Sequence, residues 1–191
     1  MRRFTTDVMA VVPEITGRPV LDLGIGDIVI TAFQTAILIA VSLIFLILLI
    51  TLRSLVDSIL VFIPLAMTAM LTLSVSVLID LPLNMANVVV IPLIFGLGVD
   101  NGIHIVKRFH QSKNVEALVH SSTPKAVFLS NLTTLGTFCA LSFSSHQGIY
   151  SIGILLTIAL TSLIFLTLVS LPALLATFSS PRSILAKEQT V

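Results

Sequence analysis

An acidic residue lies in the middle of a long apolar run, and a histidine follows it one helical turn later. The segment reads Phe95-Gly96-Leu97-Gly98-Val99-Asp100-Asn101-Gly102-Ile103-His104. Residues i and i+4 share one face of a helix, so Asp100 and His104 could pass a proton between them. A carboxylate in the middle of a membrane helix costs about 2.5–3.5 kcal/mol, and it persists where it faces protein or a water-filled cavity. The pattern predicts a proton relay.

Both residues also have a purely structural explanation. Asp100 could pair with a neighbouring polar group and only fix the packing of helices, and His104 could be an interfacial histidine that reaches towards water. Asn131, Thr133 and Thr134 open the next apolar run. They could hydrogen-bond to Asp100 across a helix interface, although threonine hydroxyls often bond their own backbone instead.

Small residues and a proline surround Asp100. Small side chains allow helices to approach closely, and proline removes a backbone donor. These positions therefore predict close helix packing or a hinge beside the acid. They are Pro92, Gly96, Gly98 and Gly102.

The elements that must position these residues are membrane helices. The chain has 191 residues, of which 56% are hydrophobic and 10% charged, whereas soluble domains carry about 25% charged residues. A membrane span needs about 20 apolar residues. The charge-free runs predict an all-α integral membrane protein, a bundle of five transmembrane helices. The predicted spans are about 28–52, 57–79, 84–107, 125–141 and 150–178.

The distribution of charge predicts the orientation. One side of the membrane receives Arg53, Lys107, Arg108, Lys113, Lys125, Arg182 and Lys187, and the two loops on the other side contain only Asp80 and His146. The positive-inside rule makes the first side cytoplasmic. Residues 1–27 are then an extracytoplasmic arm and residues 179–191 a cytoplasmic tail. This predicts a multi-pass protein of the inner, cytoplasmic membrane, with its N-terminus outside and its C-terminus in the cytoplasm.

Several classes of function are not expected. Ten basic and nine acidic residues give a net charge of +1, which does not suggest a nucleic-acid partner. Cys139 is the single cysteine, and no Cys/His cluster has metal-ligand spacing, so no metal or cofactor is expected. The Gly96–Asp100 segment superficially resembles the motif of intramembrane aspartyl proteases. Those enzymes need a second acid in the membrane, whereas Asp57 and Asp80 lie at span ends, so no enzyme activity is expected.

The ordered series of motifs resembles the resistance-nodulation-division (RND) superfamily, in its MMPL-like and hopanoid-associated branch of exporters. The resemblance covers nearly the whole chain. Members have twelve transmembrane helices in two repeats, with a large extracytoplasmic domain after the first helix of each repeat. Residues 28–178 resemble the last five helices of the second repeat, and residues 1–27 the end of its extracytoplasmic domain. The motifs are Leu81–Asn87, Pro92–His104, Thr133–Phe138, Gly148–Gly153 and Leu171–Leu175.

This resemblance implies export of lipids or other hydrophobic molecules, hopanoids among them, driven by the proton-motive force. Asp100 matches the proton-carrying acid, and Thr133 and Thr134 match polar positions on the following helix. Asn101 stands where many relatives carry an aromatic residue or a second acid. The resemblance also implies a missing N-terminal half of seven helices, so the chain would be a fragment, a remnant or a half-transporter. The alternative is a lipid-binding membrane module, similar to sterol-sensing domains, that does not transport.

Overall fold

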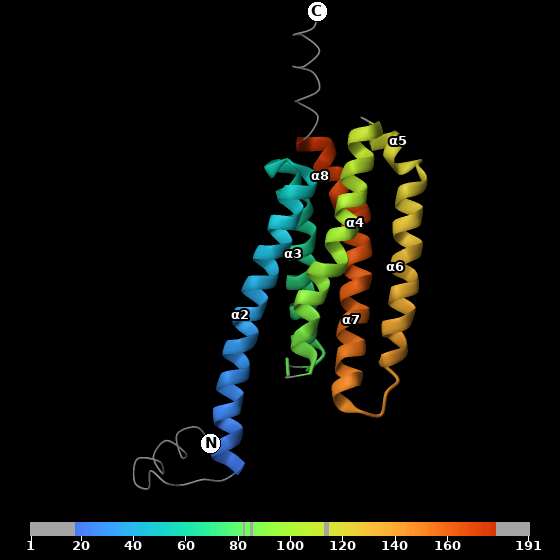
Figure 1. The fold of residues 1–191 in the computed structure, drawn as a ribbon. Helices are drawn as coiled ribbons and strands as arrows, with labels where there is room; N and C mark the ends of the chain where they lie inside the picture. Colours follow the sequence, from blue (N-terminus) through green and yellow to red (C-terminus); the bar gives the residue numbers. More distant parts are fainter. Residues whose placement is uncertain (1–17, 82, 85, 113–114, 179–191) are drawn as a thin grey trace, which may run out of the picture. The chain divides into compact units, whose positions relative to one another are not determined.

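The computed structural model describes residues 18–81, 83–84, 86–112 and 115–178, with side chains from Thr31 onwards. Every regular element in these ranges is helical (Figure 1). The predicted arm and tail lie largely or wholly outside the described residues. The elements are α2 (Arg18–Leu52), α3 (Leu55–Leu78), the 3-10 turn η1 (Asn87–Val89), α4 (Val90–Ser112), α5 (Val115–Val119), α6 (Ser122–Leu141), α7 (Gln147–Phe165), the π-helical turn η2 (Leu166–Ser170) and α8 (Leu171–Phe178).

The chain divides into two compact units, residues 1–39 and 40–191. The described part of the first unit is the beginning of α2, whose side chains from Thr31 to Ile39 are mostly exposed. The helix begins at Arg18, earlier than the predicted span start at residue 28. The helix contacts and the candidate site lie within the second unit.

Four helical segments in the described ranges are long and apolar enough to cross a membrane. They are Thr31–Leu52, Leu55–Leu78, Asn87–Ser112 and Gln147–Phe178, the last formed by α7, η2 and α8 in succession. The prediction of an all-α membrane protein is therefore confirmed. The predicted span 125–141 is a helix, α6, but α6 is not among the four, because polar residues interrupt its apolar run. A fifth span stays a prediction.

Helix α3 lies at the centre of the second unit. It packs against α4, α7, η2 and α8, and its residues Leu60, Val61 and Leu65 are buried in the main hydrophobic core. Leu48, near the end of α2, is also buried there. Helix α6 packs on α7 and on α4, but the structure buries only Val127 and Asn131 of its side chains. The faces of α6 that point away from the bundle are thus free of contact with the described chain.

Polar side chains stabilise the turns between the helices. Ser54 Oγ accepts a hydrogen bond from the backbone N–H of Asp57 and so caps α3. At the entrance to α4, Asn84 Oδ1 accepts from the N–H of Asn87, and Asn87 Oδ1 accepts from the N–H of Asn84. These two asparagines fix the start of the segment that contains Asp100.

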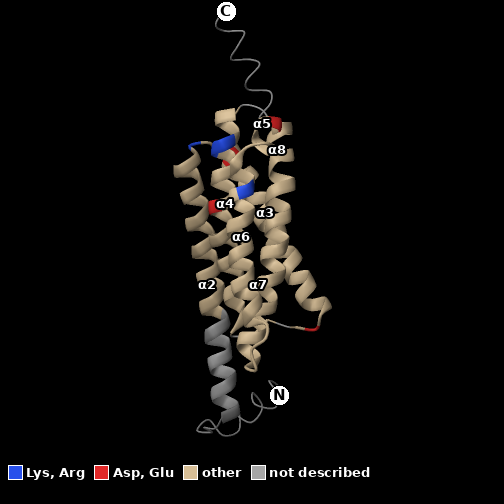
Figure 2. Cartoon of the chain, turned by 90° about the vertical axis from the view of Figure 1, so that its right-hand side faces the viewer, with Lys and Arg blue, Asp and Glu red and all other residues tan. Residues whose placement is uncertain are grey.

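Lysine and arginine residues gather towards one end of the bundle, as Figure 2 shows. The chain path explains this distribution. Arg53 follows α2, Lys107 and Arg108 are near the end of α4, and Lys125 is near the start of α6. Asp80 and His146 lie in the connections at the opposite end. We call the first end the basic end.

Two glycines of α4 allow it to approach α3 closely. A Cβ atom built on Gly98 would lie 2.1 Å from Leu65 Cδ2, and one on Gly102 would lie 2.3 Å from Val61 Cγ1. Gly153 of α7 lies against backbone instead of a side chain, because its Cβ would lie 2.4 Å from the backbone nitrogen of Ser142. Gly96 has nothing within 4 Å. Gly98, Gly102 and Gly153 therefore pack between helices, whereas Gly96 faces open space.

These contacts predict a ranking for glycine-to-alanine substitutions. Gly153→Ala is expected to lower the thermal unfolding midpoint most, because backbone atoms cannot move aside. Gly102→Ala should follow at about 1–3 kcal/mol, the usual cost of overpacking, because the branched Val61 side chain yields little. Gly96→Ala is the matched control and should leave the midpoint unchanged. Thermal unfolding in detergent would measure this, and equal effects at all three positions would contradict the packing described.

Candidate functional site: a polar face on α4 and α6

Asp100 and His104 lie together on the outer side of α4. The His104 Nε2 and Asp100 Oδ1 atoms are 3.4 Å apart, and the two side chains are 61% and 75% exposed. Asp100 sits about half-way along the spanning segment Asn87–Ser112. The structure thus brings together the two residues of the predicted relay, and it leaves their outer side uncovered by the described chain.

The neighbouring Asn101 points into the contact with α6. Its Nδ2 donates a hydrogen bond of 3.0 Å to Asn131 Oδ1, and Asn131 Nδ2 donates one of 2.7 Å to the carbonyl oxygen of Val127. The expected bond from Asn131 to Asp100 was therefore wrong. Consecutive residues of a helix point about 100° apart, so the inward-facing residue at 101 reaches α6 and Asp100 does not.

The threonines of α6 bond their own backbone. Thr133 Oγ1 and Thr134 Oγ1 both donate to the carbonyl oxygen of Ser130, over 2.7 and 3.1 Å. Thr137 Oγ1 donates in the same way to the carbonyl of Thr133. The hydroxyl protons are thus committed within α6, while the oxygens keep lone pairs that can accept a hydrogen bond.

Helix geometry turns the polar residues of α4 and α6 to a common side. The two helices run antiparallel and pack on one another (Figure 1). With Asn101 and Asn131 facing each other, rotation by about 100° per residue points both preceding residues, Asp100 and Ser130, to the same side of the pair. His104 and Thr134 fall on that side as well. We call Asp100, His104, Ser130 and Thr134 the polar face.

The remaining predicted residues divide between two sides of α4. Gly98 and Gly102 are buried against α3 and α7, whereas Gly96 is exposed one turn before Asp100. Pro92 lies in the first turn of α4, directly after η1. There, proline's missing N–H is best tolerated. The position of Pro92 thus marks the start of α4, two turns before Asp100.

Comparison with known proteins identifies the family of this chain. The MMPL family model matches residues 11–190. The chain belongs to the MMPL family. It is 39% identical over 175 residues to the hopanoid transporter HpnN of Rhodopseudomonas palustris (strain TIE-1), a match that covers 92% of this chain and 20% of that protein.

Two further relatives extend this comparison. The hopanoid transporter HpnN of Burkholderia multivorans (strain ATCC 17616 / 249) is 34% identical over 190 residues, covering 100% of this chain and 21% of that protein. A putative membrane protein of Methanocaldococcus jannaschii is 28% identical over 139 residues, covering 69% of this chain and 36% of that protein. The chain spans about a fifth of the length of the two hopanoid transporters. The expected resemblance to the MMPL and hopanoid-associated branch is confirmed.

A second polar contact was not predicted from the sequence. His110 Nε2, in the last turn of α4, lies 2.9 Å from Asp57 Oδ2, in the first turn of α3. Asp57 is buried, and its carboxylate also lies at the N-terminal end of α3, where a negative charge is favourable. In this MMPL chain the pair fastens α4 to α3 at the basic end. The sequence could have indicated this contact, because Asp57 lies in the first turn of one span and His110 in the last turn of the next.

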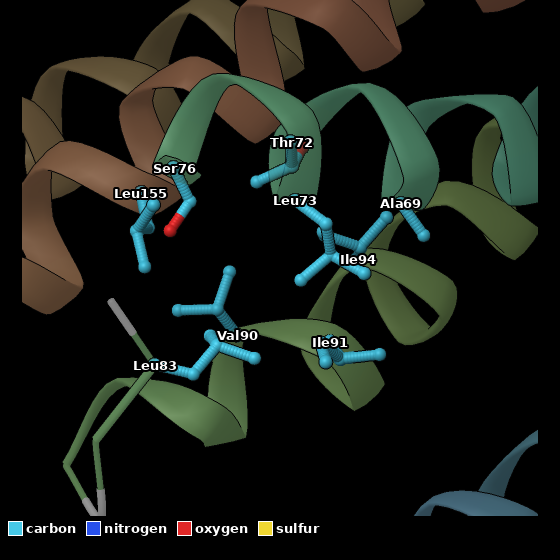
Figure 3. Close-up of a pocket in the computed structure, with 9 residues that line it drawn as sticks. All are labelled: Ala69, Thr72, Leu73, Ser76, Leu83, Val90, Ile91, Ile94 and Leu155. Atoms are coloured by element: carbon cyan, nitrogen blue, oxygen red, sulfur yellow. The ribbon is translucent and has the colours of Figure 1, made fainter. Parts of the chain in front are cut away.

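A small apolar pocket lies between α3, α4 and α7, away from the basic end (Figure 3). The cavity volume is about 10 Å³, which is about the room that one water needs. Two hydroxyl groups line the pocket and donate their hydrogen bonds elsewhere: Thr72 to the carbonyl of Thr68, and Ser76 to that of Leu81. The pocket is therefore a packing gap and is too small for a lipid.

The Asp57–His110 pair predicts a measurable coupling. Asp57→Asn and His110→Gln should each lower the free energy of unfolding by about 1 kcal/mol, because one partner is buried and the other half-exposed. The double variant should cost less than the sum, since either single change already removes the ion pair. Thermal or denaturant unfolding in detergent would measure the cycle. Strictly additive losses would show that the two side chains do not interact.

Proposed function

We propose that this chain is a membrane segment of a proton-driven exporter of lipids or other hydrophobic molecules, in which Asp100 carries the proton. The observation behind this proposal is the exposed carboxylate of Asp100, half-way along a spanning helix, beside His104. The names of the two hopanoid transporters support a lipid substrate for this chain as well.

The exposure of Asp100 implies a covering partner. A carboxylate facing hydrocarbon in mid-membrane costs about 2.5–3.5 kcal/mol or more, so such groups face the interior of a bundle or a water-filled cavity. The described chain supplies His104 on one side of the carboxylate and nothing on its outer side. We infer that further membrane helices of the complete transporter cover the polar face. The much greater length of the hopanoid transporters supports this.

The composition of α6 fits the same arrangement. We propose that α6 crosses the membrane as a fifth span, with its polar residues turned to the covering helices or to trapped water. Ser130, Asn131, Thr133, Thr134 and Thr137 lower its hydropathy, and each of the three threonine hydroxyls has a backbone acceptor. A helix that lies between protein and lipid can carry such residues, whereas one surrounded by lipid would not.

The lipid-binding module is the competing function. It would use the same helices and bind lipid whether or not Asp100 can ionise. The polar face favours transport, because a carboxylate and an imidazole at 3.4 Å in mid-membrane have no use in holding an apolar molecule. The polar face contains one carboxylate and no second acid from the described chain, so it lacks the dyad of an aspartyl protease.

Replacing Asp100 tests the proposal directly. Asp100→Asn keeps the shape of the side chain and removes its titratable proton. We expect it to abolish export of a fluorescent hopanoid analogue driven by an imposed pH gradient. The assay uses proteoliposomes that contain the full-length protein encoded by the gene. The variant should fold normally, because it removes no contact in the core.

Asp80→Asn is the matched control. Asp80 lies in the connection after α3 with a φ of 55°, a left-handed conformation that asparagine also accepts, so export should be unchanged. Full activity of Asp100→Asn would refute proton carriage by Asp100. Lipid binding with no export in any form of the protein would favour the lipid-binding module.

The proposed topology is tested with single cysteines in a Cys139→Ala background. His120 and Ser145 are exposed residues on either side of α6. If α6 crosses the membrane and the basic end is cytoplasmic, Ser145→Cys should react with a membrane-impermeant maleimide from outside. His120→Cys should react only after the membrane is opened. Reaction of both from one side would show that α6 does not cross the membrane.

A further inference from the structure

Asn101 and Asn131 are buried at the contact between α4 and α6, directly beside the polar face. Their side chains are 7% and 6% exposed, and the bond between them is 3.0 Å long. We propose that this pair positions α6 on α4 and thereby sets the surroundings of the Asp100 proton. The inference rests on the proposed function, in which Asp100 carries that proton.

The pair has a defined direction. Asn131 commits its Nδ2 to the carbonyl oxygen of Val127, one turn back on its own helix, at 2.7 Å. Its Oδ1 therefore faces α4 as an acceptor, and Asn101 must act as the donor. A side chain at 101 that cannot donate leaves a buried acceptor without its partner, which is costly at a buried site.

The pair also sets the register between α4 and α6. Antiparallel helices joined at these two residues place Asp100 between Ser130 and Thr134 along the helix axis, about 3 Å from the level of each, and His104 about 3 Å beyond Ser130, by the helical repeat of about 1.5 Å and 100° per residue. Rotation of α6 by one residue would carry Ser130 and Thr134 away from the carboxylate. Loss of the pair would therefore change the polar surroundings of Asp100 without altering Asp100 itself.

Two isosteric substitutions test the direction of the bond. Asn101→Asp places an acceptor against the acceptor of Asn131 whenever the new carboxyl group is ionised. Asn131→Asp keeps an acceptor facing Asn101 and so keeps the bond between the helices, while it loses the bond from Nδ2 to the Val127 carbonyl within α6. Both variants add one negative charge close to Asp100, so each controls for the charge of the other. Thr161→Val, which removes an exposed hydroxyl bonded within α7, is the control for loss of a polar group elsewhere.

The measurement is the rate of proton entry into proteoliposomes that contain the full-length protein encoded by the gene. A pH-sensitive dye inside the vesicles reports this rate, which is measured across a range of pH. We expect Asn101→Asp to reduce the rate at neutral pH about tenfold, the effect of one unpaired buried group. The deficit should narrow as the pH falls, because a protonated carboxyl group donates again. Asn131→Asp should lose less than Asn101→Asp, since the bond between α4 and α6 persists and only the bond to Val127 within α6 is lost.

Three outcomes decide the matter. Equal losses in both variants, or a deficit in Asn101→Asp that does not change with pH, would overturn the positioning role. A lower unfolding midpoint with an unchanged pH profile would show that the pair serves packing alone, which also overturns it. Asp100→Asn is measured in the same vesicles. If that variant still conducts protons, the proposed function itself fails, independently of the asparagine pair.

Discussion

A polar group inside a bilayer must find its partner within the protein, and this requirement explains how several buried polar residues of the described chain are placed. Buried hydroxyl groups of α3 turn back on their own helix: Thr68 donates to the carbonyl of Pro64, and Thr72 to that of Thr68. The two buried asparagines of α4 and α6 satisfy one another. Asp100 and His104 differ from all of these, because they have each other and an uncovered outer side. These two exposed residues are the ones to which we assign the proton.

Helix α4 has its packing residues on one side and its titratable residues on another. Its inner side holds Gly98 and Gly102, whose lack of a side chain lets α3 and α7 come close. Its outer side holds Gly96, Asp100 and His104. The ends of the helix are fixed independently, by the asparagine caps at its entrance and by the pair of Asp57 and His110 at the basic end. A helix held in this way on one side and at both ends can present a charged group on the other side without being pulled out of the bundle.

The sequence predicted well those features that depend on one helix at a time. Charge-free runs located the helices, and the spacing of Asp100 and His104 put them on one face. It predicted less well the features that depend on the rotation of one helix against another. A bond from Asn131 to Asp100 was considered, but Asn131 faces Asn101. The sequence of α6 does not indicate which of its faces is buried, because apolar residues occur on all of them. The contact between Asp57 and His110 joins residues far apart in the chain, and neither lies in a motif. The predicted span at α6 is not confirmed, because its polar residues keep it out of the four segments that are apolar enough to cross a membrane.

Asn101 shows why adjacent polar residues should be interpreted separately. The resemblance to RND proteins suggested a position with a chemical role, since many relatives carry an aromatic residue or an acid there. In this chain the side chain is an amide, which has no titratable proton, and it lies in a buried contact between two helices. Its neighbour Asp100 has the titratable group and the exposure. A rotation of about 100° between consecutive residues is enough to give one of them a partner within this chain and to leave the other exposed. The division follows from helix geometry alone.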